Sequence, residues 1–189
     1  TKFTERIGGT SAPDAFDAFL QGSALYNLAK DEETDRAALA SFENATQIDP
    51  NYAAAFAALS RVNTVMASFY ASGKDLLAYY DRAMEHARRA IELAPEMAEG
   101  HSALGFALTN GWLYLAGAHE PFMRSFDLGF GNAAILTAFA IYASNIGEFE
   151  DAKNVLVKCS RIYPNFAEIE YRISCLNFIL GNNVKCFTS

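Results

Sequence analysis

The feature that most constrains this chain is a recurring pair of helical patterns that ends at a proline. It is clearest in residues 133–166, where a nearly continuous apolar segment is followed by Gly147 and then by an amphipathic segment. Pro164 ends the second helix, because proline cannot continue a helix. The second segment carries its apolar residues at steps of three and four, which is one face of an α-helix: Phe149, Ala152, Leu156, Cys159 and Ile162.

The same ending returns at Pro50 and, in looser form, at Pro95. A helical hairpin that recurs with one stop signal predicts a repeat protein in which each hairpin stacks on the next. We therefore predict an all-α fold, a right-handed α-solenoid of antiparallel helix hairpins, with about four repeats plus a terminal helix. The expected helices are residues 14–28, 35–48, 52–72, 74–93, 98–110, 118–128, 133–145, 149–162 and 167–180.

Three local expectations accompany this pattern. The charged run from Lys30 to Thr34 is expected to be a solvated turn. Pro121 is tolerated only in the first turn of a helix, where its missing N–H would have no partner anyway, so that helix should begin at His119 or just before it. Gly22 falls in the middle of its helix, where a small residue lets a second helix approach closely.

The pattern also predicts the domain organisation. Residues 1–12 are polar and contain two adjacent glycines, so we expect a linker or N-terminal extension there. Residues 13–182 are expected to form the helical repeat domain, and residues 183–189 a short tail. The chain begins without methionine or an apolar leader, which indicates a piece of a longer protein and no signal peptide.

Composition narrows the class of function. The formal net charge is -7 and the pI is near 4.9, which argues against a nucleic-acid surface and against an anionic membrane surface. No uninterrupted apolar run reaches the roughly 18 residues of a membrane-spanning helix. The three cysteines are odd in number and lack C-x-x-C spacing, which favours a reducing compartment, and we expect a cytoplasmic protein.

No catalytic constellation is visible, so we expect a non-enzymatic protein without cofactor or metal. His119 and Glu120 begin like a zinc-protease motif, but Met123 stands where the second histidine belongs. A single histidine on a helix, such as His86 or His101, is far more often structural than a metal ligand. Cys159 lies on the apolar face of its helix and is expected to be a small core residue.

The chain resembles the tetratricopeptide repeat (TPR) family, whose signature is W-x2-L-G-x2-Y, A-x3-F and a final proline over 34 residues. The interval from Pro50 to Pro95 is 45 residues and therefore exceeds the family length, and Phe130 stands where one proline belongs. The matching positions are Gly22, Leu25, Ala38, Phe42 and Pro50 in the first repeat; Phe56, Leu59, Ala83, Ala90 and Pro95 in the second; Leu104, Gly105, Leu108, Ala118 and Phe122 in the third; and Phe139, Ala140, Ala143, Ala152, Leu156 and Pro164 in the fourth.

A narrower resemblance concerns the start of the repeats. The run from Ile7 to Gly22 is similar to the beginning of the C-terminal TPR region in bacterial adenylate/guanylate cyclase-like proteins and in TolB-like winged-helix regulators. In those proteins the repeats follow an output domain and are thought to regulate or tether it. This resemblance implies a cis-acting regulatory or dimerisation arm.

The TPR resemblance implies that a partner lies in a concave groove along the first helix of each hairpin. The side chains expected to face this groove are Tyr26, Asn27, Arg61, Thr64, Ser102, Phe106, Asn110, Thr137, Ile141 and Asn145, with Tyr171 and Phe178 beyond them. Some family members grip a C-terminal carboxylate with several cationic and amide side chains. Arg61 alone supplies a cation at those positions, so we expect an apolar or helical segment instead.

Asn27, Asn110 and Asn145 occupy one equivalent position and allow two interpretations. A ladder of amides could hold the backbone of an extended peptide, because an amide both donates and accepts. Alternatively, each asparagine simply ends its helix next to the turn, which is the interpretation we favour from the sequence.

The terminal helix has apolar residues but no partner helix after it in the sequence. Terminal repeats need a polar outer face, which this helix lacks, so either the chain continues or a second copy covers it. The residues expected to self-associate in a homodimer are Ile169, Ile173, Leu176 and Ile179. We thus expect a protein-protein interaction module whose partner is a protein or peptide, with the cis-acting arm as the alternative.

Overall fold

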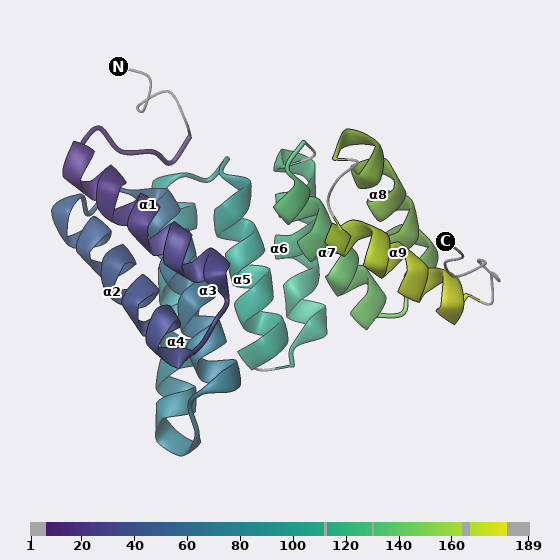
Figure 1. Ribbon diagram of the computed structural model, residues 1–189, viewed down its shortest axis with the longest axis horizontal. Helices are drawn as coiled ribbons and strands as arrows, with labels where there is room; N and C mark the ends of the chain where they lie inside the picture. The colour runs from purple at the N-terminus through teal and green to yellow at the C-terminus, as the bar shows by residue number, and fades with distance from the viewer. Residues whose placement is uncertain (1–6, 112, 130, 164–166, 181–189) are drawn as a thin grey trace. The chain divides into compact units, whose positions relative to one another are not determined.

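The computed structural model describes residues 7–111, 113–129, 131–163 and 167–180, and within them it contains helices and no strands (Figure 1). This content of secondary structure confirms the predicted all-α class. The helices are α1 (Pro13–Leu28), α2 (Glu32–Ile48), α3 (Ala53–Phe69), α4 (Gly73–Leu93), α5 (Ala98–Gly111), α6 (Leu115–Leu128), α7 (Ala133–Asn145), α8 (Phe149–Ile162) and α9 (Ala167–Ile179). Residues 164–166, where the last proline stop was expected, and the tail 183–189 lie outside the described residues.

The chain divides into two compact units, unit 1 (Thr1–Leu128) and unit 2 (Gly129–Ser189). In unit 1, α1 pairs with α2, α3 with α4 and α5 with α6, and α3 also packs against α1, α2 and α5. In unit 2, α7 pairs with α8, and α8 packs against α9. Consecutive helices therefore form hairpins, and in unit 1 successive hairpins stack as a solenoid requires.

Helix α2 begins earlier than the sequence suggested. Asp31 is its N-cap, and the Asp31 carboxylate accepts hydrogen bonds from the backbone N–H and the hydroxyl of Thr34, at 2.9 and 2.6 Å. These bonds hold the pKa of Asp31 below its ordinary value. Asp31 is therefore a helix cap and residues 32–34 are helical, so the expected solvated turn is wrong for residues 32–34. Acidic residues favour a helix N-terminus because they complement its dipole.

Two glycines allow the helices of a hairpin to approach closely. A Cβ placed on Gly22 would lie 2.8 Å from the Phe42 ring, and a Cβ on Gly105 would lie 2.8 Å from the Phe122 ring. Both rings are buried. The close contact predicted at Gly22 is confirmed, and the same contact recurs in the third hairpin.

Small side chains fill much of the core of unit 1. The seam between α3, α4 and α5 is built largely from alanines, among them Ala57, Ala87, Ala90 and Ala103. Alanine costs little side-chain entropy on burial and lets backbones come close. Larger residues fill the other seam, where Phe42, Leu59 and Val62 are buried together.

Helix α6 does not follow the prediction made from Pro121. The helix begins at Leu115 and contains Pro121 in its interior, so the expected start near His119 is wrong. Its first turn follows Leu113, which has a φ of 50°, and Ala118 donates its N–H to the carbonyl of Tyr114. Pro121 is buried, so tertiary packing outweighs the lost backbone hydrogen bond.

The segment before α1 contacts the helices of unit 1 from Gly8 onward. The Gly8 carbonyl accepts a hydrogen bond from the N–H of Ala54 in the first turn of α3, and a Cβ on Gly8 would lie 2.4 Å from the sulfur of Met97. Thr10 is buried and its hydroxyl donates to the Asp49 carboxylate. Gly8 and Thr10, which lie in the expected linker, are therefore held against the helices.

Candidate protein-interaction face

The first helices of the three hairpins in unit 1 lie next to one another, with α3 in contact with both α1 and α5. We call the surface carried by Tyr26 and Asn27 on α1, Arg61 and Phe69 on α3 and Phe106 on α5 the first-helix face. Four of these five residues were predicted from the sequence to face a partner. On α3, Arg61 and Phe69 are two steps of four residues apart, and residues three and four apart share a helix face.

Arg61 and Phe106 meet across the seam between α3 and α5. The guanidinium carbon of Arg61 lies 5.6 Å from the centre of the Phe106 ring, within the range of a cation–π contact. Both side chains are half-buried. The contact holds a cation and an aromatic surface together on the first-helix face.

A cavity of about 500 Å³ lies between the end of α1, the start of α2 and the end of α3. The volume is within the range of small-ligand pockets. Phe69 is 75% exposed although it is large and apolar. The cavity is lined by Tyr26, Asn27, Ala29, Asp35, Val65, Phe69 and Tyr70.

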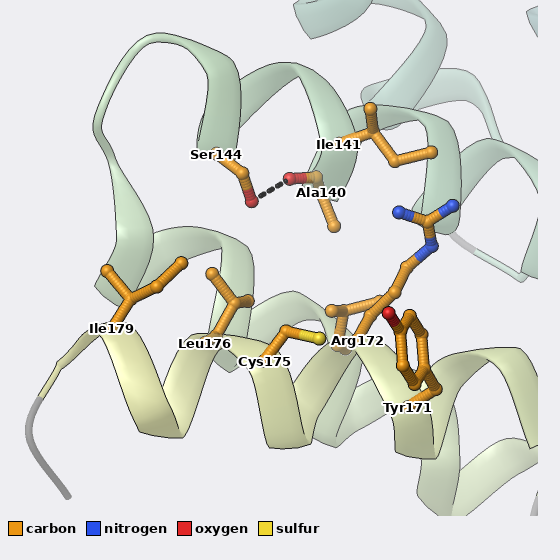
Figure 2. Close-up of a pocket in the computed structure, with 9 residues that line it drawn as sticks. Ala140, Ile141, Ser144, Tyr171, Arg172, Cys175, Leu176 and Ile179 are labelled. Atoms are coloured by element: carbon orange, nitrogen blue, oxygen red, sulfur yellow. Dashed lines mark hydrogen bonds between the residues drawn. The ribbon is translucent and has the colours of Figure 1, made fainter.

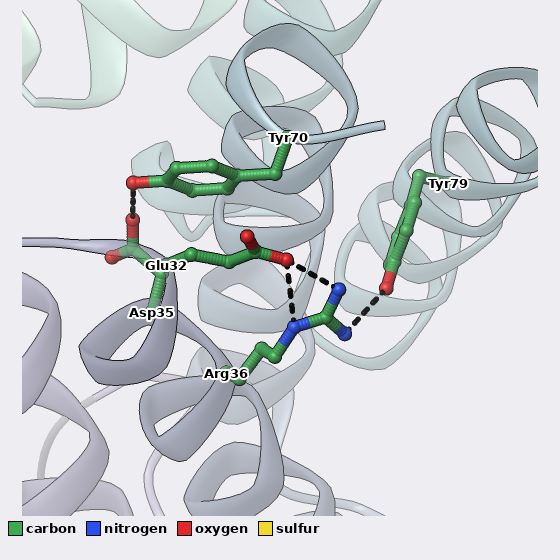
Figure 3. A network of polar contacts seen from close by, with 5 residues as sticks. All are labelled: Glu32, Asp35, Arg36, Tyr70 and Tyr79. Atoms are coloured by element: carbon green, nitrogen blue, oxygen red, sulfur yellow. Dashed lines mark hydrogen bonds and ion pairs between the residues drawn. The ribbon is translucent and has the colours of Figure 1, made fainter. Parts of the chain in front are cut away.

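A buried carboxylate lies in the wall of this cavity. Asp35 is only 4% exposed, and its Oδ2 accepts a hydrogen bond of 2.9 Å from the Tyr70 hydroxyl (Figure 3). This hydrogen bond, followed by burial and by the negative charges of Asp35, Asp31 and Glu32, raises the pKa of Tyr70 above its ordinary value. The hydroxyl therefore stays protonated and donates to the carboxylate.

Arg36 and Tyr79 lie on the other side of Glu32 (Figure 3). The Arg36 guanidinium contacts Glu32 Oε1 at 2.6 Å and donates to the Tyr79 hydroxyl at 3.4 Å. The Glu32 contact, followed by the Tyr79 contact, raises the pKa of Arg36. Arg82 stacks over the Tyr79 ring at 4.4 Å. Arg36, Tyr79 and Arg82 border a second, polar cavity of about 370 Å³ between α2 and α4.

Three residues predicted for the groove are buried and do not face a partner. Thr64 is fully buried, and its hydroxyl donates to the carbonyl of Ser60 at 3.0 Å. Ser102 and Thr137 are also buried. These side chains are small enough to fit between two packed helices. The position of a residue around its helix does not by itself show whether a neighbouring helix covers that residue or leaves it exposed.

The three asparagines lie at the ends of their helices, as in the interpretation we favoured. Asn110 donates its side-chain N–H to the carbonyl of Phe106 at 2.8 Å, within its own helix. Asn27 and Asn145 are exposed in the last turns of α1 and α7. Asn63, which the sequence did not single out, makes the same bond to Leu59 inside α3, also at 2.8 Å. The Asn110 amide N–H is therefore already used by its own helix.

Unit 2 has a smaller pocket of its own, of about 160 Å³, between α7, α8 and α9 (Figure 2). Ile141 and Ser144 border it from α7, and the Ser144 hydroxyl donates to the carbonyl of Ala140 at 2.7 Å. Tyr171, Arg172, Cys175, Leu176 and Ile179 border it from α9. The predicted groove residue Ile141 and two predicted self-association residues thus share one pocket.

The terminal helix α9 presents a narrower apolar surface than predicted. Ile169 and Leu176 are buried, because they pack inward, and they are not available for self-association. Ile173 is half-buried and Ile179 is exposed. Phe178 is 85% exposed, so the homodimer stays a prediction that now rests on Ile173, Phe178 and Ile179.

His86, His101 and Cys159 pack against or bond to other parts of the protein. His101 Nε2 lies 2.8 Å from the carbonyl of Pro95. His86 lies against Phe56, and burial lowers its pKa. Cys159 is buried, as predicted, and burial raises its pKa. Within the part of the chain that the structure describes, no group of three or more His, Cys, Asp or Glu side chains could hold a metal ion.

Sequence reasoning missed Asp35, Phe69 and Tyr70 as members of the cavity. Asp35 was expected only as the start of a helix, and Phe69 and Tyr70 were absorbed into one long apolar helix. The available signal was Ser72-Gly73, since a helix that ends just before it exposes its last aromatic residues.

Among the described residues, no helix is long and apolar enough to cross a bilayer.

Solved structures with a similar fold are TPR proteins. TTC0263, a thermophilic TPR protein from Thermus thermophilus, has a TM-score of 0.63 at 16% identity, over 87% of this chain and 99% of that one. The type IV pilus biogenesis factor PilW has a TM-score of 0.66 at 18% identity, over 91% and 72%. YrrB, described as a TPR protein with an unusual peptide-binding site, has a TM-score of 0.52 at 18% identity, over 97% and 86%.

No protein-family model matches the sequence, and no curated protein matches it. The structural likeness nevertheless defines the fold as a TPR-like α-solenoid, as the recurring hairpins predicted. Identities of this size establish the fold alone.

Proposed function

We propose that this chain is a non-enzymatic protein-protein interaction module that binds a peptide or helical segment on the first-helix face of unit 1. The observation that carries the proposal is the cavity of about 500 Å³ beside the exposed Phe69. A large apolar side chain left in water next to a cavity is typical of a surface that a partner covers.

The Arg61–Phe106 contact supports the same face. Aromatic and arginine side chains are the residue types that most often dominate binding energy at protein interfaces. Their mutual contact at 5.6 Å reduces the freedom of both side chains before a partner arrives. Binding then costs less side-chain entropy than if each were free.

A selection from a library of random peptides of about 12 residues tests the proposal, with the purified chain as bait. We expect selected peptides to lose about tenfold or more in affinity for Phe106→Ala and Arg61→Ala, as measured by fluorescence anisotropy, because such anchors contribute over about 1.4 kcal/mol. Arg89→Ala on α4 and the buried Ser102→Ala are matched controls and should bind like the wild type. Failure to select any peptide, or equal binding by all four variants, would contradict the proposal.

A second candidate is the cis-acting regulatory or dimerisation arm of a bacterial cyclase-like or transcriptional signalling protein. The observation that favours it is the docking of residues 7–12, where Gly8 and Thr10 contact the helices. A docked segment transmits orientation between neighbouring domains better than a free linker does. The coding sequence upstream of Thr1 tests this candidate, since it requires a nucleotide-cyclase-like or DNA-binding domain there.

A further inference from the structure

We infer that the cavity between α1 and α3 accepts a lysine or arginine side chain of the bound segment, with an apolar residue of that segment lying against Phe69. The inference rests on the function proposed above and specifies the chemistry of the partner at one position. The carboxylate of Asp35 and the ring of Tyr26 would contact the cation. Asp35 and Tyr70 both line the cavity, and Figure 3 shows the hydrogen bond between them.

The described residues that line the cavity include the carboxylate of Asp35 and no lysine or arginine, which favours a cation, and the segment that carries Asp35 is acidic. Residues 30–36 contain four carboxylates and two cationic side chains, a formal excess of two negative charges. Lys30 contacts Asp31 at 3.4 Å and Arg36 contacts Glu32 at 2.6 Å. The two carboxylates in excess of these pairs are Glu33 and Asp35.

The first turn of α2 contains the acidic residues Glu32, Glu33 and Asp35, and the helix start by itself does not explain why Asp35 is buried. Carboxylates in a first turn complement the helix dipole, which accounts for Glu32 and Glu33 on the surface. Asp35 is almost completely buried, and burying a carboxylate is costly unless it is paired and hydrogen-bonded. Tyr70 supplies a neutral donor, and a cation from a partner would add a charge-assisted bond, which is about twice as strong.

Aromatic and apolar side chains complete the site. Tyr26 and Tyr70 contribute ring faces, which attract a cation at close range, and Val65 and Phe69 contribute an apolar wall. Arg61 lies two helical turns before Phe69, about 12 Å along α3, and its guanidinium is stacked on Phe106. An acidic or neutral residue of the segment is therefore expected opposite Arg61.

The test uses the whole chain and three sets of synthetic peptides of about 12 residues. The sets share a fixed central Leu and differ only in the next position, which is Arg, Gln or Glu, and the other positions are random. We expect enrichment of the Arg set by about tenfold over the Glu set, because a charge-assisted hydrogen bond contributes about 1.5–3 kcal/mol. Binding of Arg peptides should also weaken with added salt.

Two substitutions localise the effect. Asp35→Asn removes the charge but keeps an oxygen that accepts from Tyr70, and Phe69→Lys places a cation at the mouth of the cavity. Both should lower affinity for Arg peptides about tenfold, since each alters one charge beside the bound cation. Phe69 is exposed, so Phe69→Lys tests the site even if Asp35→Asn reduces folding. Glu85→Gln, at an exposed position on α4, is the matched control and should leave affinity unchanged.

The outcomes separate this inference from the proposed function. If Gln or Glu peptides are enriched equally or better, and their binding needs Arg61 and Phe106, the interaction module stands and the cation site is refuted. Arg peptides that bind Asp35→Asn and Phe69→Lys as well as the wild type would also refute it. If no set binds at all, the proposed function fails together with the inference.

Discussion

Unit 1 and unit 2 bury their helices in different ways. In unit 1 the middle helix α3 packs against α1, α2, α4 and α5, and much of its seam is alanine. In unit 2 the buried side chains are larger, among them Ile135, Leu136, Phe139 and Leu156, and α9 keeps Phe178 and Ile179 exposed. The same hairpin pattern thus leads to a closely packed stack in one region and a hairpin with one further helix in the other.

The difference shows what each kind of seam depends on, and unit 1 contains both kinds, since Phe42, Leu59 and Val62 form a seam of larger side chains there. Alanine seams gain stability from close backbone approach and lose it when any atom is added, because such interiors have no spare volume. A seam of large side chains loses stability when atoms are removed, through lost burial and the cavity left behind. Removing atoms from the core and adding atoms to it should therefore change the stability of the two units, and a change of pH should affect the stability of unit 1.

The largest effects are expected from truncating one large core residue in each unit. Phe42→Ala should lower the free energy of unfolding by about 3–5 kcal/mol and Leu156→Ala by about 2–5 kcal/mol, since both side chains are almost fully buried. Hydrogen exchange with peptide resolution should show faster exchange in α1–α4 for Phe42→Ala and in α7–α9 for Leu156→Ala. Faster exchange over both units in each variant would mean that they unfold as one, and the comparison would fail.

Adding atoms to a close contact in unit 1 should have an intermediate effect. Gly22→Val should lower the free energy of unfolding by about 2 kcal/mol, because the new side chain meets the buried Phe42 ring at 2.8 Å or less. Chemical denaturation measures this change. Gly131→Val in unit 2 is the control, with no atom within 4 Å of its Cβ position, and it should change stability by less than about 0.5 kcal/mol. A tolerated Gly22→Val would show that the seam can relax.

The smallest effect concerns pH and belongs to unit 1, which contains all three histidines. Burial lowers the pKa of His86 in the folded chain, with a further lowering from Arg82 that Glu85 opposes. The unfolded chain therefore takes up the proton first, so stability is lost as pH falls through the unfolded value of about 6.5. Denaturation at pH 7.5 and 5.5 should show a smaller decrease for His86→Gln than for the wild type. An identical decrease in the variant and the wild type would show that His86 does not cause the loss of stability at low pH.

The fold was largely predictable because its signals are local. Stops at Pro50 and Pro95, the break at Gly147 and the contact at Gly22 each act within one hairpin, and the structure has helices where they indicated. The start of α6 was not predictable in this way. Pro121 lies inside a helix because packing around a buried residue outweighs a local preference, and such packing is not visible in a linear pattern.

The candidate site was predictable only in part. Tyr26, Arg61 and Phe106, which helical phase assigned to the groove, are half-buried, and their contact with a partner stays a prediction. Helical phase failed for Thr64 and Ser102, because neighbouring helices cover the edge of the stripe on which they lie. It could not bring Asp35 to Tyr70, since their contact joins residues 35 positions apart through the packing of α2 against α3.

The docked stretch before α1 has a consequence for how the chain tolerates cleavage. Gly8 supplies the acceptor for an N–H at the start of α3, and its backbone lies against Met97 and Ala53. A protease that cut ahead of Pro13 would release more than a loose end. It would leave the N–H of Ala54 without its acceptor. It would also expose the sulfur of Met97 to water, where the sulfur can be oxidised to the sulfoxide.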